Sequence, residues 1–278
     1  MYPAKKSLQQ SNYAAIPTDE HEGYCTIEVY ALKHLVQTAM QKPCYQEASW
    51  VNNEHVRRDF ESICKKRAET FGDKGIQKNL IKRFYNGSKQ SCSRLEITVT
   101  THKPAGQVCL RIIHSCTNHI FADISTLYSY TIREHIRVNY PWVYDNTDDI
   151  LQALRDVHTN GSAILPKCDL NDFDLNGDHD TMCTRVSQPV WGAGSGGHHD
   201  VLYGMLTNQF VSTPVIEDGL WQVTSGAGMG FPCAGDVSDV NYAELVEKDL
   251  MRNVRNLGLL FYGRFRDGIL CLVQTIYD

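Results

Sequence analysis

The sequence lacks the cysteine patterns that mark small disulfide-bonded domains and structural zinc sites. Its ten cysteines stand singly among 278 residues, and none forms a C-x-x-C pair. This spacing favours reduced thiols in a nuclear or cytoplasmic protein. No apolar run reaches 18 residues, and residues 1–23 contain no apolar core of a signal peptide. We therefore expect an intracellular protein that is neither secreted nor inserted in a membrane.

A basic excess is also missing, because the formal net charge is −5. This balance argues mildly against a protein that binds nucleic acid over its whole surface. Basic side chains nevertheless gather between residues 57 and 103, where 12 Lys or Arg face 5 Asp or Glu. The segment is suited to contact phosphates, although a solvated helical surface would have the same composition.

What is present is a mixture of helical and strand patterns without internal repeats. Helical spacing is found in six segments, namely 31–39, 53–70, 122–138, 146–157, 199–210 and 237–257. Strand patterns are found at 24–30, 95–101, 108–114 and 163–168, and the apolar runs of 258–276 flank a polar tip, which is typical of a hairpin. We expect an α+β fold with antiparallel pairing at the end of the chain.

Three regions follow from these patterns. Residues 1–22 are expected to be a disordered lead-in, residues 23–160 an N-terminal region, and residues 161–278 a second region that carries most of the chemistry. The stretch DLNDFDLNGDHD (169–180) has five aspartates in twelve residues. Its spacing opens like an EF-hand loop, but position twelve is Cys183 in place of the required glutamate. A surface turn and the end of a metal-binding strand remain as alternatives.

Two glycine-rich segments are candidate ligand sites. Residues 192–197 fit G-x-G-x-x-G, but no clear strand precedes them, which disfavours a dinucleotide site. The adjacent His198 and His199 are expected on the surface rather than at a metal. Residues 223–247 form a glycine-rich loop that leads into a helix, where the backbone can approach a ligand closely.

Two aspartates are the candidate metal ligands. Asp169 ends a predicted strand, and Asp267 lies at the tip of the C-terminal hairpin. If these strands are neighbours, the two carboxylates meet at one edge of the sheet, and Mg²⁺ is the hard cation that such oxygen ligands favour. Two such metals activate an attacking 3′-hydroxyl and stabilise a leaving pyrophosphate.

The order of several segments resembles a known family. These segments are THKPAGQVCLRIIHS (101–115), YDNTDDILQAL (144–154), AILPKCDLNDF (163–173), GAGMGFPCAG (226–235) and FYGRFRDG (261–268). Over residues 95–270 they resemble the fingers and palm of a reverse transcriptase, most like those of Penelope-like retroelements and related eukaryotic enzymes. The strand ending at Asp169 matches motif A, the loop at 226–235 motif B, and the hairpin motif C.

The resemblance implies a right-hand polymerase fold, with fingers and an antiparallel palm sheet backed by helices. It implies roles for individual residues. Asp169 and Asp267 would be catalytic and bind Mg²⁺ or Mn²⁺. The nucleotide would contact Lys103, Arg111, Phe173, Asp174, Gly228, Met229 and Gly230, whereas Lys82, Arg83 and Lys89 would follow the nucleic-acid backbone.

Departures from the family pattern limit this interpretation. Motif C usually ends in two aspartates, and Gly268 stands at the second position. Asp174 replaces an aromatic residue, as in viral RNA-dependent RNA polymerases, and Ala234 replaces a serine. The chain ends ten residues after the hairpin tip, so a thumb is expected to be missing from it.

The sequence therefore predicts an RNA-directed DNA polymerase domain whose partners are an RNA template, a DNA primer and nucleoside triphosphates. Gly268 and the expected lack of a thumb also suit a non-catalytic, nucleic-acid-binding descendant of such an enzyme. Asp174 suits an RNA-dependent RNA polymerase-like domain. A structural domain that merely binds metal is the remaining alternative.

Overall fold

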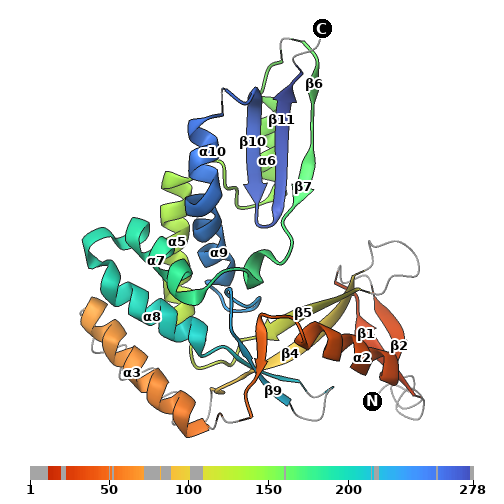
Figure 1. Cartoon of the computed structure of the whole chain (residues 1–278), viewed down its shortest axis with the longest axis vertical. Helices are drawn as coiled ribbons and strands as arrows, with labels where there is room; N and C mark the ends of the chain where they lie inside the picture. The colour runs from red at the N-terminus through yellow and green to blue at the C-terminus, as the bar shows by residue number, and fades with distance from the viewer. Residues whose placement is uncertain are drawn as a thin grey trace.

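The computed structural model describes residues 12–19, 23–49, 51, 53–71, 82, 89–100, 109–159, 161–213, 215, 219–254 and 256–275. This part of the chain forms an elongated molecule with a five-stranded sheet toward one end and a four-stranded sheet toward the other (Figure 1). Helices lie between and beside the two sheets. The fold is a mixed α and β structure, as the sequence predicts.

The larger sheet has strands in the order β3 (Tyr45–Glu47), β9 (Gly219–Val223), β8 (Phe210–Thr213), β4 (Ser93–Thr100) and β5 (Cys109–Ser115). Strands β4 and β8 are parallel, and the other neighbouring pairs are antiparallel. In β4, Leu95, Ile97 and Val99 are buried, while Arg94 and Glu96, which alternate with them, are exposed. This period of two shows that one face of the sheet is covered.

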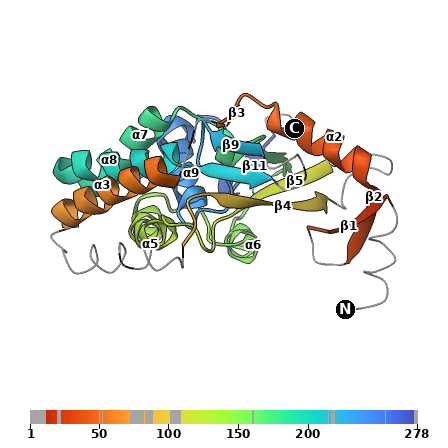
Figure 2. The same ribbon diagram turned by 90° about the horizontal axis from the view of Figure 1, so that it is seen from below.

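Helix α2 (Val29–Met40) covers that face (Figure 2). Its residues Leu32, Val36 and Met40 recur every four positions and pack in one hydrophobic cluster with the buried residues of β4. Beside it, β1 (Tyr13–Pro17) and β2 (Tyr24–Glu28) form an antiparallel pair. The expectation that residues 1–22 are disordered is wrong for β1, because Ile16 packs against the same cluster.

The smaller sheet is built on the C-terminal hairpin. Strands β10 (Leu259–Phe265) and β11 (Gly268–Gln274) are antiparallel, and β11 also pairs with β6 (Ala163–Ile164) and β7 (Lys167–Asp169). The predicted hairpin and the predicted strand that ends at Asp169 are both confirmed. Because β11 joins them, sequence segments about a hundred residues apart lie side by side.

Helices make up most of the rest of the fold. They are α3 (Asn53–Phe71), α5 (Ala122–Asn139), α6 (Thr147–Arg155), α7 (His179–Trp191), α8 (Ser195–Thr207), α9 (Ala234–Tyr242), a π-helical turn η3 (Ala243–Glu247) and α10 (Lys248–Arg252). Tyr128 and Ile132 of α5, Met182 of α7, Leu202 of α8 and Val237 of α9 are fully buried, and they bring these four helices together in the main hydrophobic cluster. Among the described residues, no helix is long and apolar enough to cross a membrane.

Most predicted elements are present, with two differences around α7 and α8. The helix expected at 199–210 begins at Ser195 and ends at Thr207, and Phe210 belongs to β8. The G-x-G-x-x-G segment follows helix α7 rather than a strand, which excludes the dinucleotide-binding arrangement. The sequence patterns also gave no indication of α7 itself.

His198 is not a surface residue, so that expectation is wrong. It is 8% exposed, its ring stacks on Trp191 with centroids 4.2 Å apart, and Nδ1 lies 3.2 Å from the Tyr128 hydroxyl. His199 is half-buried and lies 3.2 Å from the carboxylate of Asp180. His198 is therefore a core residue. Its burial depends on Trp191 and Tyr128, which lie elsewhere in the sequence, so the pattern around His198 does not predict it.

The aspartates at the two ends of the stretch 169–180 have different structural roles. Asp169 ends β7, and Phe173–Leu175 form a short 3-10 helix, η1. Asp178 then caps α7, where its carboxylate accepts a hydrogen bond from the Thr181 backbone N–H at 2.9 Å. Cys183, the twelfth position of the EF-hand pattern, is fully buried. These facts exclude the calcium loop.

Candidate active site

Asp169 and Asp267 are brought together by strand pairing. Asp169 lies opposite Gly268 in the antiparallel β7–β11 register, and the Leu170 N–H donates to the Asp267 carbonyl at 2.8 Å. The two aspartates are therefore neighbours across the strands at one end of the hairpin sheet. This is the juxtaposition that the sequence predicted, and the binding of a metal there stays a prediction.

The two carboxylates line a pocket with a volume of about 390 Å³ between the hairpin sheet and α6. Ile150 and Leu151 of α6 and Phe265 of β10 form part of its apolar lining. The Lys167 ammonium lies 3.8 Å from Asp169, but both side chains are more than 60% exposed, so this ion pair is weak and screened by salt. The pocket therefore combines exposed negative charge with an apolar wall.

Gly268, the position at which the family pattern has a second aspartate, has room for a side chain. A Cβ built there would lie 3.5 Å from the Phe265 carbonyl and 3.8 Å from Asp169 Oδ1, which are ordinary contact distances. Its φ is outside the left-handed range that favours glycine. Hence neither sterics nor backbone conformation requires glycine at this position.

The donor set fits a hard divalent cation that keeps part of its water shell. Mg²⁺ in proteins is commonly held by one or two carboxylates, and water and substrate phosphates supply the other oxygens. Asp169 and Asp267 could supply two such ligands. Within the described part of the chain, no cluster of three or more His, Cys, Asp or Glu forms a complete protein cage for a metal.

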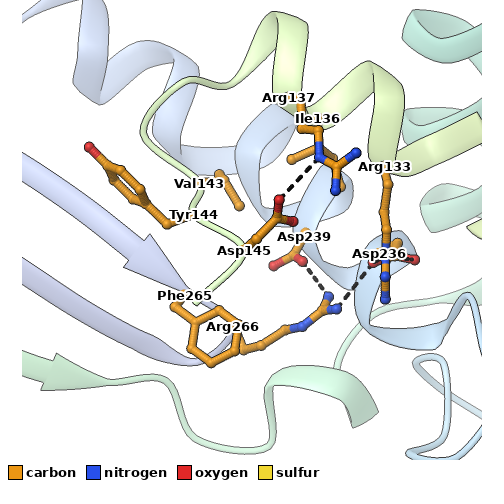
Figure 3. A pocket seen from close by; sticks show the side chains of 10 residues that line it. All are labelled: Arg133, Ile136, Arg137, Val143, Tyr144, Asp145, Asp236, Asp239, Phe265 and Arg266. Atoms are coloured by element: carbon orange, nitrogen blue, oxygen red, sulfur yellow. Dashed lines mark hydrogen bonds and ion pairs between the residues drawn. The ribbon is translucent and has the colours of Figure 1, made fainter. Parts of the chain in front are cut away.

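The hairpin tip is anchored by Arg266, the residue before Asp267 (Figure 3). Arg266 has a φ of +55°, a conformation that costs a non-glycine residue about 1 kcal/mol or more. Its guanidinium forms ion pairs with Asp239 and, at 3.1 Å, with Asp236 of α9, and Arg133 of α5 also lies 3.1 Å from Asp236. These contacts hold the strained turn, and with it Asp267, against the two helices.

A second arginine, Arg264 in strand β10, is completely buried. Arg264 is 0% exposed, and its Nε and Nη2 donate to the two oxygens of Glu247 at 2.7 and 3.0 Å. Its Nη1 forms an ion pair with Asp239. Burial disfavours the charged guanidinium, but its hydrogen bonds to Glu247 and Asp239 and their negative charges outweigh burial and raise the pKa of Arg264. The Tyr262 hydroxyl and Trp142 Nε1 also donate to Glu247.

Arg264, Arg266 and Arg133 are thus matched by Asp236, Asp239 and Glu247 in one network behind the hairpin tip. The sequence patterns did not predict that these residues meet. A signal was present, because an arginine alternating with apolar residues inside a buried strand requires a buried carboxylate. The acidic residues of the following helix are spaced three and eight positions apart, which places them near one helical face.

The glycine-rich loop before α9 packs against protein backbone. Gly226 has a φ of +71°, and a Cβ there would lie 2.3 Å from the Asp174 carbonyl. A Cβ on Gly228 would lie 2.3 Å from the His114 ring, and one on Gly230 only 1.7 Å from the His114 carbonyl. The need for glycine is therefore explained by packing on η1 and β5. Met229 is 37% exposed, and a contact of Gly228, Met229 and Gly230 with nucleotide stays a prediction.

Phe173 and Asp174 are adjacent in η1 and have different neighbours. The Phe173 ring lies over the Arg264 guanidinium, 5.4 Å from ring centroid to Cζ, and meets Tyr242 edge to face. Asp174 is partly buried, and this burial raises the pKa of its carboxyl, with Arg266 opposing the shift and Asp267 adding to it. The Asp174 carboxyl thus lies within electrostatic reach of the hairpin tip, and the contacts of Phe173 and Asp174 with a nucleotide stay predictions.

The predicted cationic residues are only partly described. Lys103 and Arg83 lie outside the described residues, and Lys82 is exposed. The Arg111 side chain on β5 is 47% exposed and lies 3.7 Å from Asp19, so it remains accessible to an anion. Lys89 is different, because its side chain is 9% exposed and lies 3.4 Å from Asp123. This burial argues against a nucleic-acid contact by Lys89.

Comparison with known proteins finds similar solved structures but no match to a family model or to a curated protein sequence. A telomerase structure from Candida albicans, complexed with a fragment of telomeric RNA, matches with a TM-score of 0.62 at 9% identity, over 98% of this chain and 47% of that chain.

Two structures of apo telomerase from Candida tropicalis also match. The one truncated from its C-terminal domain gives a TM-score of 0.57 at 9% identity over 95% of this chain and 53% of that chain. The other gives 0.55 at 8% identity over 95% and 47%. The chain spans about half the length of these proteins. Telomerase is a specialised reverse transcriptase, so the chain has a reverse transcriptase-like fold.

Proposed function

We propose that this chain is the fingers and palm of an RNA-directed DNA polymerase that binds a primer–template and a nucleoside triphosphate with Mg²⁺. The observation that carries the proposal is the pairing of Asp169 with the hairpin tip that bears Asp267, in a chain with a reverse transcriptase-like fold. In this assignment the hairpin sheet is the palm, and the five-stranded sheet belongs to the fingers. A relationship to Penelope-like elements is part of the proposal.

Each residue has a physical role in this proposal. Bound Mg²⁺ would supply a Lewis acid that lowers the pKa of a 3′-hydroxyl and neutralises a leaving pyrophosphate. Asp169 and Asp267 hold their carboxylates at a fixed spacing because strand pairing and the Arg266 contacts orient them. Arg111 is available to bind phosphate oxygens from the other sheet. Asp174 lies near Asp267 and is placed to accept a hydrogen bond from a sugar hydroxyl.

Primer extension tests the proposal directly. With an RNA template, a DNA primer, dNTPs and Mg²⁺, the chain should extend the primer, and Asp169→Asn should slow extension about a hundredfold or more, because a lost metal ligand removes several kcal/mol of transition-state stabilisation. Asp249→Asn is the matched control, since Asp249 is 77% exposed and pairs with Arg252 on the surface. Equal rates in both variants would contradict the assignment, and faster extension with rNTPs would favour an RNA polymerase.

A non-catalytic nucleic-acid-binding protein is the second candidate, and Gly268 favours it, because the hairpin tip offers one carboxylate where the family pattern has two. We expect Gly268→Asp to strengthen Mg²⁺ binding about tenfold, since an added carboxylate replaces a neutral water and the position accepts a side chain.

Calorimetric titration with Mg²⁺ measures this effect, and Gly268→Ala is the matched control for the change of backbone. The Asp variant should bind Mg²⁺ more tightly, while the Ala variant should bind it as the unaltered chain does. If both variants have the same Mg²⁺ affinity, the hairpin tip is not part of a metal site, and the polymerase assignment loses its central observation.

A further inference from the structure

A second pocket lies beside the hairpin sheet, apart from the two aspartates. Its volume is about 320 Å³, within the range of small-molecule sites. It is formed by the segment after β7, by α7 and by α9 with its π-helical turn, and its lining includes Phe173, Asn176, Arg185, Asn241 and Tyr242. None of these elements carries Asp169 or Asp267.

This pocket belongs to the opposite face of the sheet. Asp169, Gly268 and Phe265 are register partners and share one face, so Arg264, the next residue of β10, points to the other. The Arg264 guanidinium lies under the rings of Phe173 and Tyr242, at 5.4 and 5.2 Å. A ligand in this pocket would therefore be separated from the carboxylate pair by the sheet itself.

The lining suits a flat, partly polar ligand. Phe173 and Tyr242 meet edge to face with centroids 6.1 Å apart, and Leu245 beside them is 52% exposed. The carboxamides of Asn176 and Asn241 add hydrogen-bond donors and acceptors at the same pocket. Aromatic and amide groups together are the means by which proteins bind unstacked nucleobases.

The charge of the pocket favours an anionic group on that ligand. Arg185 is the charged member of the described lining, and its Nη1 donates to the neutral Asn241 Oδ1 at 3.3 Å. In the described part of the chain it has no carboxylate within ion-pair distance. A half-buried guanidinium without a counter-charge is a binding partner for a phosphate.

A buried hydroxyl is also available at the pocket. Ser238 is 2% exposed and lines the pocket, and in the described part of the chain its Oγ has no hydrogen-bond partner of good geometry. Burial raises the pKa of neighbouring Asp174, and Ser238 lies near enough to oppose that shift. A buried hydroxyl without a well-formed bond is stabilised by a polar ligand group.

We propose that this pocket binds one nucleotide, with its base against Phe173, Tyr242 and Leu245 and its phosphate on Arg185. The nucleotide is either free in solution or an unstacked member of a single strand, since both present the same base and phosphate. The site does not depend on the polymerase assignment, because it requires neither the aspartate pair nor a metal.

Titration of the full chain with AMP in the presence of EDTA tests the site without a contribution from metal. Arg185→Gln should weaken AMP binding about tenfold or more, because a charge-assisted contact to phosphate is lost, and should leave adenosine binding unchanged. Arg252→Gln is the matched control, since Arg252 is an exposed residue of α10 that does not line the pocket. Arg185→Lys, which keeps the charge, should lose less affinity than Arg185→Gln.

Further variants and probes separate the outcomes. Asp169→Asn should bind AMP as the unaltered chain does, and a loss of AMP binding there would move the nucleotide to the carboxylate site and overturn the proposal. It is equally overturned if AMP does not bind, or if Arg185→Gln binds AMP with unchanged affinity. If a five-nucleotide oligoadenylate displaces AMP, the pocket can bind a nucleotide that belongs to a single strand. If AMP binds and the oligoadenylate does not displace it, the ligand is a free nucleotide.

Discussion

Replacing Arg264 with methionine should lower the free energy of unfolding by about 3–5 kcal/mol, the cost of leaving buried carboxylates without their counter-charge. Glu247 is fully buried and Asp239 is 5% exposed, and both accept hydrogen bonds from this guanidinium. Methionine fills a similar volume, so the loss is mainly electrostatic. Urea unfolding of the full chain, followed by circular dichroism, measures the change.

Two further variants make the Arg264 prediction specific. Arg252→Met removes an exposed arginine that pairs with Asp249, and we expect a loss below about 1 kcal/mol. Adding Glu247→Gln to Arg264→Met should recover part of the stability, because the uncompensated charge is then removed. Equal losses for Arg264→Met and Arg252→Met, or no recovery in the double variant, would show that the network contributes little to stability.

This network also bears on function, because it fixes the strand that ends in the hairpin tip. Arg264 in β10 and Arg266 in the turn that follows it attach this strand to the helix after the glycine-rich loop. An exposed aspartate in a two-residue turn would otherwise sample many positions. The buried ion pairs therefore explain how a tip with a strained Arg266 can hold Asp267 beside Asp169.

The sequence could predict the hairpin and the strand before Asp169, because both have local signals. Alternating apolar residues, a two-residue polar tip and a carboxylate at the end of an apolar run lie within a few positions of one another. Their meeting required a further step, since strand neighbours are set by long-range pairing. The order of the family-like motifs supplied that step, and the register of Asp169 with Gly268 agrees with it.

Features that depend on distant partners could not be predicted. No local sequence pattern indicates which ring of the adjacent pair His198 and His199 is buried. The His198 ring is buried because it packs against Trp191 and Tyr128. The glycines at 226–230 could allow close approach of either a ligand or another part of the protein. The position of His114 against Gly228 and Gly230 shows that the protein itself packs there. Lys89 belongs to a basic segment, yet Asp123, which lies 34 residues away, holds it against the protein.

Acid should destabilise the fold below about pH 6.5, because two buried histidines resist protonation. Burial lowers the pKa of His114 to about 4 and that of His119 to about 3, whereas an unfolded histidine titrates near 6.5. Below pH 6.5 the unfolded chain takes up protons that the folded chain does not, so stability is fully present above that pH and is lost as pH falls toward 4. At pH 5 each histidine should cost on the order of 2 kcal/mol.

Urea unfolding at pH values between 7.5 and 5 tests this, with His114→Gln as the informative variant. Glutamine cannot gain the proton, so the pH dependence of the variant should be shallower by about one proton, whatever its stability at neutral pH. The partly buried Asp174 acts in the opposite direction, since its raised pKa lets the folded chain bind a proton first, but this contribution is common to both chains and cancels in the difference. His119→Gln should give a similar reduction, and the double variant the sum of both. If the variants lose stability with acid as steeply as the unaltered chain, the two rings are already protonated or solvated in the folded state, and the packing of the glycine-rich loop on His114 is looser than the contacts described above.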